Sequence, residues 1–218
     1  ISLGGDYEER LDYREVVLSN RVKDALFRIN KGIPTEALEE AYRRIITFNS
    51  PMLEENNRSF HRLLTEGIDV SFAEDGNIRT KNVQIVDFSE EGIKNNEFLV
   101  VNQFTIIENE ERRPDLLIFV NGIPLVIIEL KSASDENVGI ESAYNQIQTY
   151  KKDIPSLFNY NAFCILSDGI NAKAGTITSN EERYMNWRSI DGKVVEPLSN
   201  PQYEVMFGGM LQKHRLLD

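Results

Sequence analysis

Apolar residues in the first third of the chain recur every three or four positions, which is the spacing of amphipathic helices. This pattern predicts three helices, from Tyr13 to Asn30, from Thr35 to about Phe48, and from Ser50 to Gly67. Thr35 is a candidate helix cap, and Gly32 and Gly67 are typical helix stops. We therefore expect the N-terminal part of the chain to be mostly helical.

After Gly67 the pattern changes to short apolar runs separated by turn residues, which predicts β-strands. The predicted strands are Ile68–Phe72, Val83–Phe88, Phe98–Ile107, Leu116–Val120, Pro124–Leu130 and Asn161–Leu166. Asn121-Gly122 is a strong hairpin signal, and a further helix is expected from about Glu136 to Lys152. The pattern as a whole predicts an α/β fold with one mixed sheet flanked by helices.

Composition places the chain among soluble globular proteins. Its 218 residues are 41% hydrophobic and 27% charged, which is typical of a domain with a sizeable core. No apolar run approaches the roughly 20 residues that span a bilayer, and residues 1–6 lack the basic and apolar regions of a secretory signal. The single cysteine, Cys164, cannot form an internal disulfide. We therefore expect a cytoplasmic protein that does not contact a membrane.

The net charge of −11 argues against a free-standing DNA-binding protein, because Lys and Arg contacts to phosphates supply most nonspecific affinity. Most of the acidic excess lies in residues 1–139, and residues 140–218 are nearly neutral. If a protein of this charge acts on DNA, long-range electrostatics oppose its approach. The DNA would then have to be delivered by a tethered or partner motor.

Two carboxylates and one ammonium are expected to converge at one end of the predicted hairpin. Residues two apart in a strand share a face, so Glu129 and Lys131 project together. Counting back from the turn places Asp115 opposite Ile128 and Glu129 on the neighbouring strand. Paired carboxylates suit Mg²⁺, and a lysine beside them can stabilise charge on a phosphate during hydrolysis. Alternatively, Lys131 forms a structural ion pair with one of the acids.

The order of these residues resembles a known signature. Asp115 preceded by proline, followed by Glu129-x-Lys131, looks like the PD-(D/E)xK nuclease motif. In the RecB-like branch of that superfamily a Gln-x-x-x-Tyr motif follows on a helix, and Gln146 and Tyr150 stand in that place. Residues four apart on a helix share a face, so both side chains can point to one site. The alternative is that they are ordinary residues of a helix surface.

The resemblance extends over most of the chain. Further segments that carry it are Asn102-Gln103-Phe104, Arg113-Pro114-Asp115, Phe119–Lys131, Ser167-Asp168-Gly169 and Ala174-Gly175-Thr176. Together they are similar to the N-terminal domain of type I restriction R subunits. The resemblance implies that Asp115, Glu129 and Lys131 are catalytic, and that the two acids bind Mg²⁺, with Mn²⁺ as a substitute. It implies supporting roles for Gln146 and Tyr150.

Two further expectations follow from this resemblance. Such nucleases often carry another acid on an early helix, for which Glu15 is the candidate, with plain solvent exposure as the alternative. The chain is expected to comprise a helical part at 1–67, a PD-(D/E)xK nuclease core at 68–200, and a connection towards a helicase-like motor at 201–218. It lacks a Gly-x-x-x-x-Gly-Lys-Ser/Thr loop, so ATP is expected to act only through that motor.

The function that the resemblance implies is Mg²⁺-dependent cleavage of double-stranded DNA by a type I restriction enzyme, together with methyltransferase and specificity subunits. Two alternatives stay open. One is another RecB-like nuclease, such as an exonuclease or repair enzyme that digests DNA from free ends. The other is a noncatalytic docking module that keeps the nuclease fold and binds a partner through its acidic surface.

Overall fold

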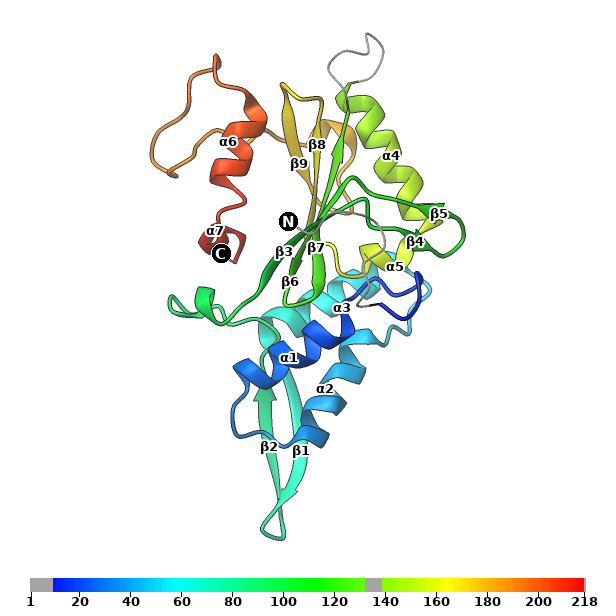
Figure 1. Cartoon of the computed structure of the whole chain (residues 1–218), viewed down its shortest axis with the longest axis vertical. Coiled ribbons are helices and arrows are strands. Elements are labelled where there is room, and N and C mark those ends of the chain that lie inside the picture. Colours follow the sequence, from blue (N-terminus) through cyan, green and yellow to red (C-terminus); the bar gives the residue numbers. More distant parts are fainter. Residues whose placement is uncertain (1–9, 132–138, 218) are drawn as a thin grey trace.

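A five-stranded mixed sheet forms the centre of the computed structural model, which describes residues 10–131 and 139–217 (Figure 1). The strands, in their order across the sheet, are β3 (Phe98–Asn102), β6 (Leu116–Val120), β7 (Ile123–Leu130), β8 (Phe163–Ser167) and β9 (Ala172–Gly175). Only β7 and β8 are parallel among these neighbouring pairs. The predicted α/β class with a mixed sheet flanked by helices is confirmed.

Helices flank the sheet on both sides (Figure 1). Helix α4 (Ile140–Asp153) makes the crossover from β7 to β8 and is followed by the short α5 (Pro155–Phe158). On the other side lie α6 (Gln202–Gly209) and α7 (Lys213–Leu216). Strand β7 is buried along all but its last residue, as expected for a central strand covered on both faces. Of the helix predicted from Glu136, positions 136–138 lie outside the described residues.

Three N-terminal helices pack at one end of the sheet, as predicted (Figure 1). They are α1 (Ser19–Ile29), α2 (Thr35–Ile46) and α3 (Leu53–Glu66). Two helix starts and one helix cap differ from the prediction, and one of these differences is that α3 begins at Leu53 and not at Ser50. The first helix begins at Ser19 and not at Tyr13, because a turn around Asp12 precedes it and Val16 to Leu18 are buried without being helical. Thr35 is the first helical residue, and its side chain does not cap the helix.

A separate antiparallel hairpin, β1 (Ile68–Glu74) and β2 (Asn77–Val83), projects from this helical end (Figure 1). Sequence analysis placed the second strand at Val83–Phe88 and joined the hairpin to the main sheet, and both expectations were wrong. The second strand is instead the polar run after the Asp75-Gly76 turn, whose backbone pairs with β1 although its side chains are mostly exposed. Backbone pairing across a tight turn therefore outweighed the apolar pattern.

The predicted strand Phe98–Ile107 is also interrupted. Its first part is β3, and its last two residues form β4 (Ile106–Ile107), which pairs with β5 (Glu111–Arg112) outside the main sheet. The chain turns away between them at Gln103, which has a left-handed backbone with φ of 52°. Short 3₁₀ helices at Gly92–Lys94 and Glu181–Arg183 complete the described elements.

The division of the chain at residues 67 and 200 stays a prediction. In the last segment, α6 lies next to β9, and Val205 and Met206 are buried.

None of the helices within residues 10–131 and 139–217 has the length and apolar content needed to cross a bilayer.

Cys164 lies in β8, and its side chain is fully buried. Burial raises the pKa of its thiol to about 12, and Sγ lies 3.4 Å from Oδ1 of Asn161.

Because the thiolate is the reactive form, we expect Cys164 to resist an aromatic disulfide reagent in the native protein at pH 8 and to react fully in denaturant. The chain has a single cysteine, so the released chromophore reports this thiol directly. Rapid stoichiometric reaction without denaturant would contradict the buried position.

Candidate active site

The turn between β6 and β7, together with a β-bulge between Ile118 and Phe119, sets the register of the site. Asn121 and Gly122 have φ of 52° and 80°, the positive values that two-residue hairpin turns require. Gly122 also lies close to α1, because a Cβ atom there would meet the Leu18 carbonyl oxygen at 2.7 Å. Leu116 pairs with Ile128 in the resulting ladder. Asp115 therefore lies level with Glu129, as the sequence predicted.

A direct hydrogen bond connects Asp115 to the neighbouring strand. Its Oδ2 accepts a hydrogen bond from the backbone N–H of Leu130 at 2.8 Å, one residue beyond Glu129. Asp115 is partly exposed, whereas Glu129 is only 3% exposed. The two carboxylates thus lie at the same end of the hairpin, one at the surface and one buried below it.

The Glu129 carboxylate has a partner on each oxygen. Its Oε1 accepts a hydrogen bond from Nζ of Lys131 at 2.7 Å, and its Oε2 accepts one from the Tyr150 hydroxyl at 3.1 Å. Tyr150 lies on α4, which covers this face of the sheet. Gln146, one turn earlier on α4, is half-buried and contacts the Tyr150 hydroxyl. The structure therefore brings together Asp115 and the four other residues of the predicted cluster.

The electrostatics of the cluster are dominated by burial. Loss of water raises the pKa of Glu129 above its usual range, and the nearby charge of Asp115 acts in the same direction. The hydrogen bonds from Lys131 and Tyr150 oppose this shift. Burial and the charge of Glu129 also raise the pKa of Tyr150 above its ordinary value, so its hydroxyl stays protonated and can donate. The site therefore concentrates negative charge that only one ammonium partly offsets.

Sequence analysis gave no role to Gln103, which contacts Asp115 directly. Its Nε2 donates a hydrogen bond to Oδ1 of Asp115 at 2.9 Å, and its Oε1 accepts one from Nη2 of Arg113 at 3.1 Å. The residue sat inside an apolar run that looked like one continuous strand. Only the left-handed backbone at this position, which the sequence pattern does not reveal, turns its side chain to the site.

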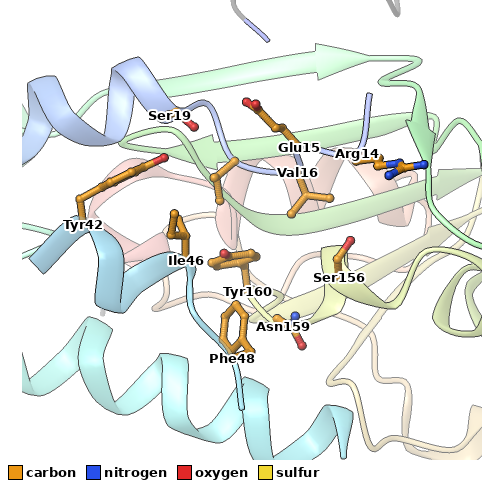
Figure 2. A pocket seen from close by; sticks show the side chains of 11 residues that line it. Arg14, Glu15, Val16, Ser19, Tyr42, Ile46, Phe48, Ser156, Asn159 and Tyr160 are labelled. Atoms are coloured by element: carbon orange, nitrogen blue, oxygen red, sulfur yellow. The ribbon is translucent and has the colours of Figure 1, made fainter. Parts of the chain in front are cut away.

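Glu15 lies just before the helix on which it was expected and not within it. It precedes α1 and lines a pocket of about 290 Å³ with residues of α2 and the segment around Tyr160 (Figure 2). Figure 2 shows its carboxylate directed away from the rings of Phe48 and Tyr160. The residues that line this pocket do not include Asp115, Glu129 or Lys131. The expected helical position was wrong, and a catalytic role for Glu15 stays a prediction without support from its location.

A family model and several known proteins match this chain over most of its length. Residues 1–183 match the family model described as Type I restriction enzyme R protein N terminus. The chain is 32% identical over 213 residues to the endonuclease subunit of the type I restriction enzyme HindI from Haemophilus influenzae. It is 36% identical over 190 residues to a Methanocaldococcus jannaschii protein provisionally named as the endonuclease subunit of the type I restriction enzyme MjaIXP.

These alignments cover 96% and 85% of the chain, but only 20% and 18% of the two relatives. The chain thus spans about a fifth of their length. A third relative, the endonuclease subunit of the type I restriction enzyme EcoprrI from Escherichia coli, is 29% identical over 231 residues, which cover 100% of this chain and 68% of that protein. The family match over residues 1–183 includes every residue of the candidate site in this chain.

Proposed function

The chain belongs to the family of type I restriction enzyme R protein N termini, and from this premise we propose that it is a Mg²⁺-dependent endonuclease domain that cleaves double-stranded DNA. We assign Asp115, Glu129 and Lys131 as its catalytic residues in a PD-(D/E)xK arrangement. Gln146 and Tyr150 support them from α4. The observation that carries the proposal is the buried Glu129 carboxylate held beside the Asp115 carboxylate.

This arrangement is costly for a purely structural ion pair. Burial and the second carboxylate both disfavour ionised Glu129, whereas one lysine and one tyrosine favour it. If Lys131 only served to neutralise a carboxylate, an acid at the surface would suffice at lower cost. A buried acid with a raised pKa beside a second carboxylate is typical of functional sites. A bound cation would relieve the repulsion between Asp115 and Glu129.

The donor set fits Mg²⁺. Within the part of the chain that the structure describes, no group of three or more His, Cys, Asp or Glu residues is arranged to hold a metal ion. We propose Asp115 and Glu129, whose carboxylates lie at the same end of the hairpin, as the two carboxylate ligands. Mg²⁺ is commonly bound by one or two carboxylates together with waters and substrate phosphates, and it does not need an all-protein cage. A site of two carboxylates whose remaining positions are filled by water matches this preference.

The residues of the site divide the chemistry of phosphodiester hydrolysis between them. When bound, Mg²⁺ supplies positive charge for the phosphate oxygens and promotes ionisation of a water. Asp115 and Glu129 hold the cation, and Tyr150 fixes the orientation of the Glu129 carboxylate. The Lys131 ammonium donates a hydrogen bond to Glu129, and it would also stabilise the negative charge that develops on the phosphate. Arg113 is exposed beside them, and its guanidinium is suited to a phosphate oxygen of the DNA.

The charge of the chain bears on the context in which this domain would act. A net charge of −11 opposes unaided binding to DNA, so we propose that an ATP-driven motor elsewhere in the R subunit brings DNA to the site. Methyltransferase and specificity subunits would complete the enzyme in the cytoplasm. Recognition of the DNA sequence would then reside outside this chain.

The proposal is tested by calorimetric titration of Mn²⁺ into the full chain and into its Glu129→Gln and Asp115→Asn variants. We expect saturable binding to the wild type and a loss of at least about tenfold in affinity for each variant, because each removes one charged ligand. Circular dichroism checks that the variants stay folded. A wild-type protein without saturable Mn²⁺ binding would contradict the proposed metal site and favour a noncatalytic docking module.

A further inference from the structure

The backbone at Gln103 adopts a conformation that its residue type disfavours. Its φ of 52° lies in the left-handed region, which is unfavourable for a residue other than glycine. Such conformations persist where surrounding interactions hold them, and they collect at functional sites. Here the backbone N–H of Gln103 donates to the carbonyl oxygen of Asp115 at 3.0 Å. Gln103 is thus connected through its backbone to Asp115, the more exposed of the two acids.

The orientation of the Gln103 amide is fixed by its two neighbours. The Asp115 carboxylate can only accept a hydrogen bond, and the Arg113 guanidinium can only donate. Nε2 must therefore face Asp115, and Oε1 must face Arg113, which is how the side chain lies, at 2.9 Å and 3.1 Å. The opposite orientation would place two acceptors together and two donors together. A single amide group thus links the acid to the neighbouring cation.

Both oxygens of Asp115 are held as a result. Oδ1 accepts the hydrogen bond from Gln103, and Oδ2 accepts the one from the Leu130 backbone at 2.8 Å. A carboxylate held at both oxygens keeps its orientation, and each oxygen retains a further lone pair for a cation. Asp115 is partly exposed, so without the Gln103 bond its side chain would be free to adopt other rotamers.

We propose that Gln103 is a positioning residue that holds the Asp115 carboxylate in its metal-binding orientation, with Arg113 fixing the orientation of the amide. This inference rests on the proposed metal site. Residues that orient metal ligands typically contribute 10- to 100-fold to metal affinity or activity. Gln103 contacts Asp115 and not the reacting groups, so its effect is expected on metal affinity before any DNA is present.

The test is Mn²⁺ titration of the full chain with Gln103→Gly and Gln103→Ala. Glycine removes the amide and accepts the left-handed backbone without strain, whereas alanine removes the amide and keeps the strain. We expect both variants to bind Mn²⁺ about tenfold more weakly than the wild type. We also expect the glycine variant to unfold at a higher urea concentration than the alanine variant, because only glycine relieves the strain. If the two variants lose the same Mn²⁺ affinity but differ in stability, the loss of affinity follows from the missing amide and not from a less stable fold.

Asp115→Asn is the reference that distinguishes the two hypotheses. If Asp115→Asn weakens Mn²⁺ binding but Gln103→Gly binds like the wild type, the metal site stands and the role of Gln103 is refuted. The same conclusion follows if only the less stable alanine variant loses affinity. If the wild type and Asp115→Asn bind Mn²⁺ equally, or neither binds it, the proposed metal site fails, and the inference about Gln103 fails with it.

Discussion

Replacing Glu129 with glutamine is expected to reduce DNA cleavage by about 1000-fold or more, because a metal-held phosphate loses several kcal/mol of charge stabilisation. The variant is to be placed in an R subunit that carries this chain as its N-terminal domain and assembled with methyltransferase and specificity subunits. Cleavage of an unmodified circular plasmid then measures the effect. Cleavage of circles would also distinguish a restriction endonuclease from an exonuclease that needs free ends.

The same substitution is expected to leave the fold intact. Glutamine keeps the size of the side chain and can still accept the hydrogen bond from Lys131. The pKa of Glu129 is raised in the folded protein, so its contribution to stability is present at low pH and is lost as the pH rises through the folded pKa. At neutral pH the ionised carboxylate therefore opposes folding. An uncharged glutamine is expected not to lower the free energy of unfolding.

Glu66→Gln provides the matched control, because it makes the same chemical change at an exposed position at the end of α3. We expect this variant to cleave DNA like the wild type. Substantial cleavage by the Glu129→Gln enzyme would refute the assignment of Glu129. A loss of cleavage in both variants would instead point to a general effect on assembly of the enzyme.

The site was predictable from the sequence where local rules set the geometry. A two-residue turn fixes the pairing of its flanking strands, and the two-residue period of a strand fixes which side chains share a face. These two rules placed Asp115 opposite Ile128 and Glu129 and projected Lys131 beside Glu129. A β-bulge between Ile118 and Phe119, which the residue pattern does not predict, shifts the pairing by one residue and brings Asp115 level with Glu129. The spacing of Gln146 and Tyr150 on a helix likewise matched a shared direction towards the site.

The remaining features depend on conformations or contacts that a pattern of residue types does not encode. The left-handed backbone at Gln103 breaks an apolar run, and the polar strand β2 forms because it pairs with β1. The apolar residues Val16 and Val17 continue a helical pattern, yet they fill the core before α1 begins. This last difference also separated Glu15 from the helix on which it was expected.

Asn121, which the sequence identified only as a turn residue, proves to be a buried centre of hydrogen bonding. It is 1% exposed, and its amide uses its full capacity of two accepted and two donated bonds. Oδ1 accepts from the Glu97 backbone N–H at 2.8 Å and from Nη2 of Arg28 at 3.1 Å. Nδ2 donates to the Ile85 carbonyl oxygen at 2.9 Å and to Oδ1 of Asn96 at 2.8 Å. One side chain thus connects α1, the loop before β3 and the hairpin that carries the site.

Asn121→Ala is expected to lower the free energy of unfolding by about 4 kcal/mol. About 3 kcal/mol comes from the polar partners left without hydrogen bonds, and about 1 kcal/mol from the left-handed backbone, which alanine disfavours. Asn121→Gly removes the hydrogen bonds without the strain, so we expect a loss of about 3 kcal/mol. These are large fractions of the roughly 5–15 kcal/mol that stabilise a typical domain. Urea unfolding of the full chain, followed by circular dichroism, measures both values.

The hairpin turn at Asp75-Gly76 supplies a control with the same backbone and without the buried amide. Its φ values of 51° and 77° match the 52° and 80° of Asn121-Gly122, but Asp75 is exposed. Asp75→Ala is therefore expected to cost only about 1 kcal/mol, the contribution of backbone strain alone. If Asn121→Ala cost no more than Asp75→Ala, the four hydrogen bonds of Asn121 would contribute nothing to stability. A loss several times larger at Asn121 would establish that this amide, and not the turn conformation, holds the β6–β7 hairpin against the N-terminal helices.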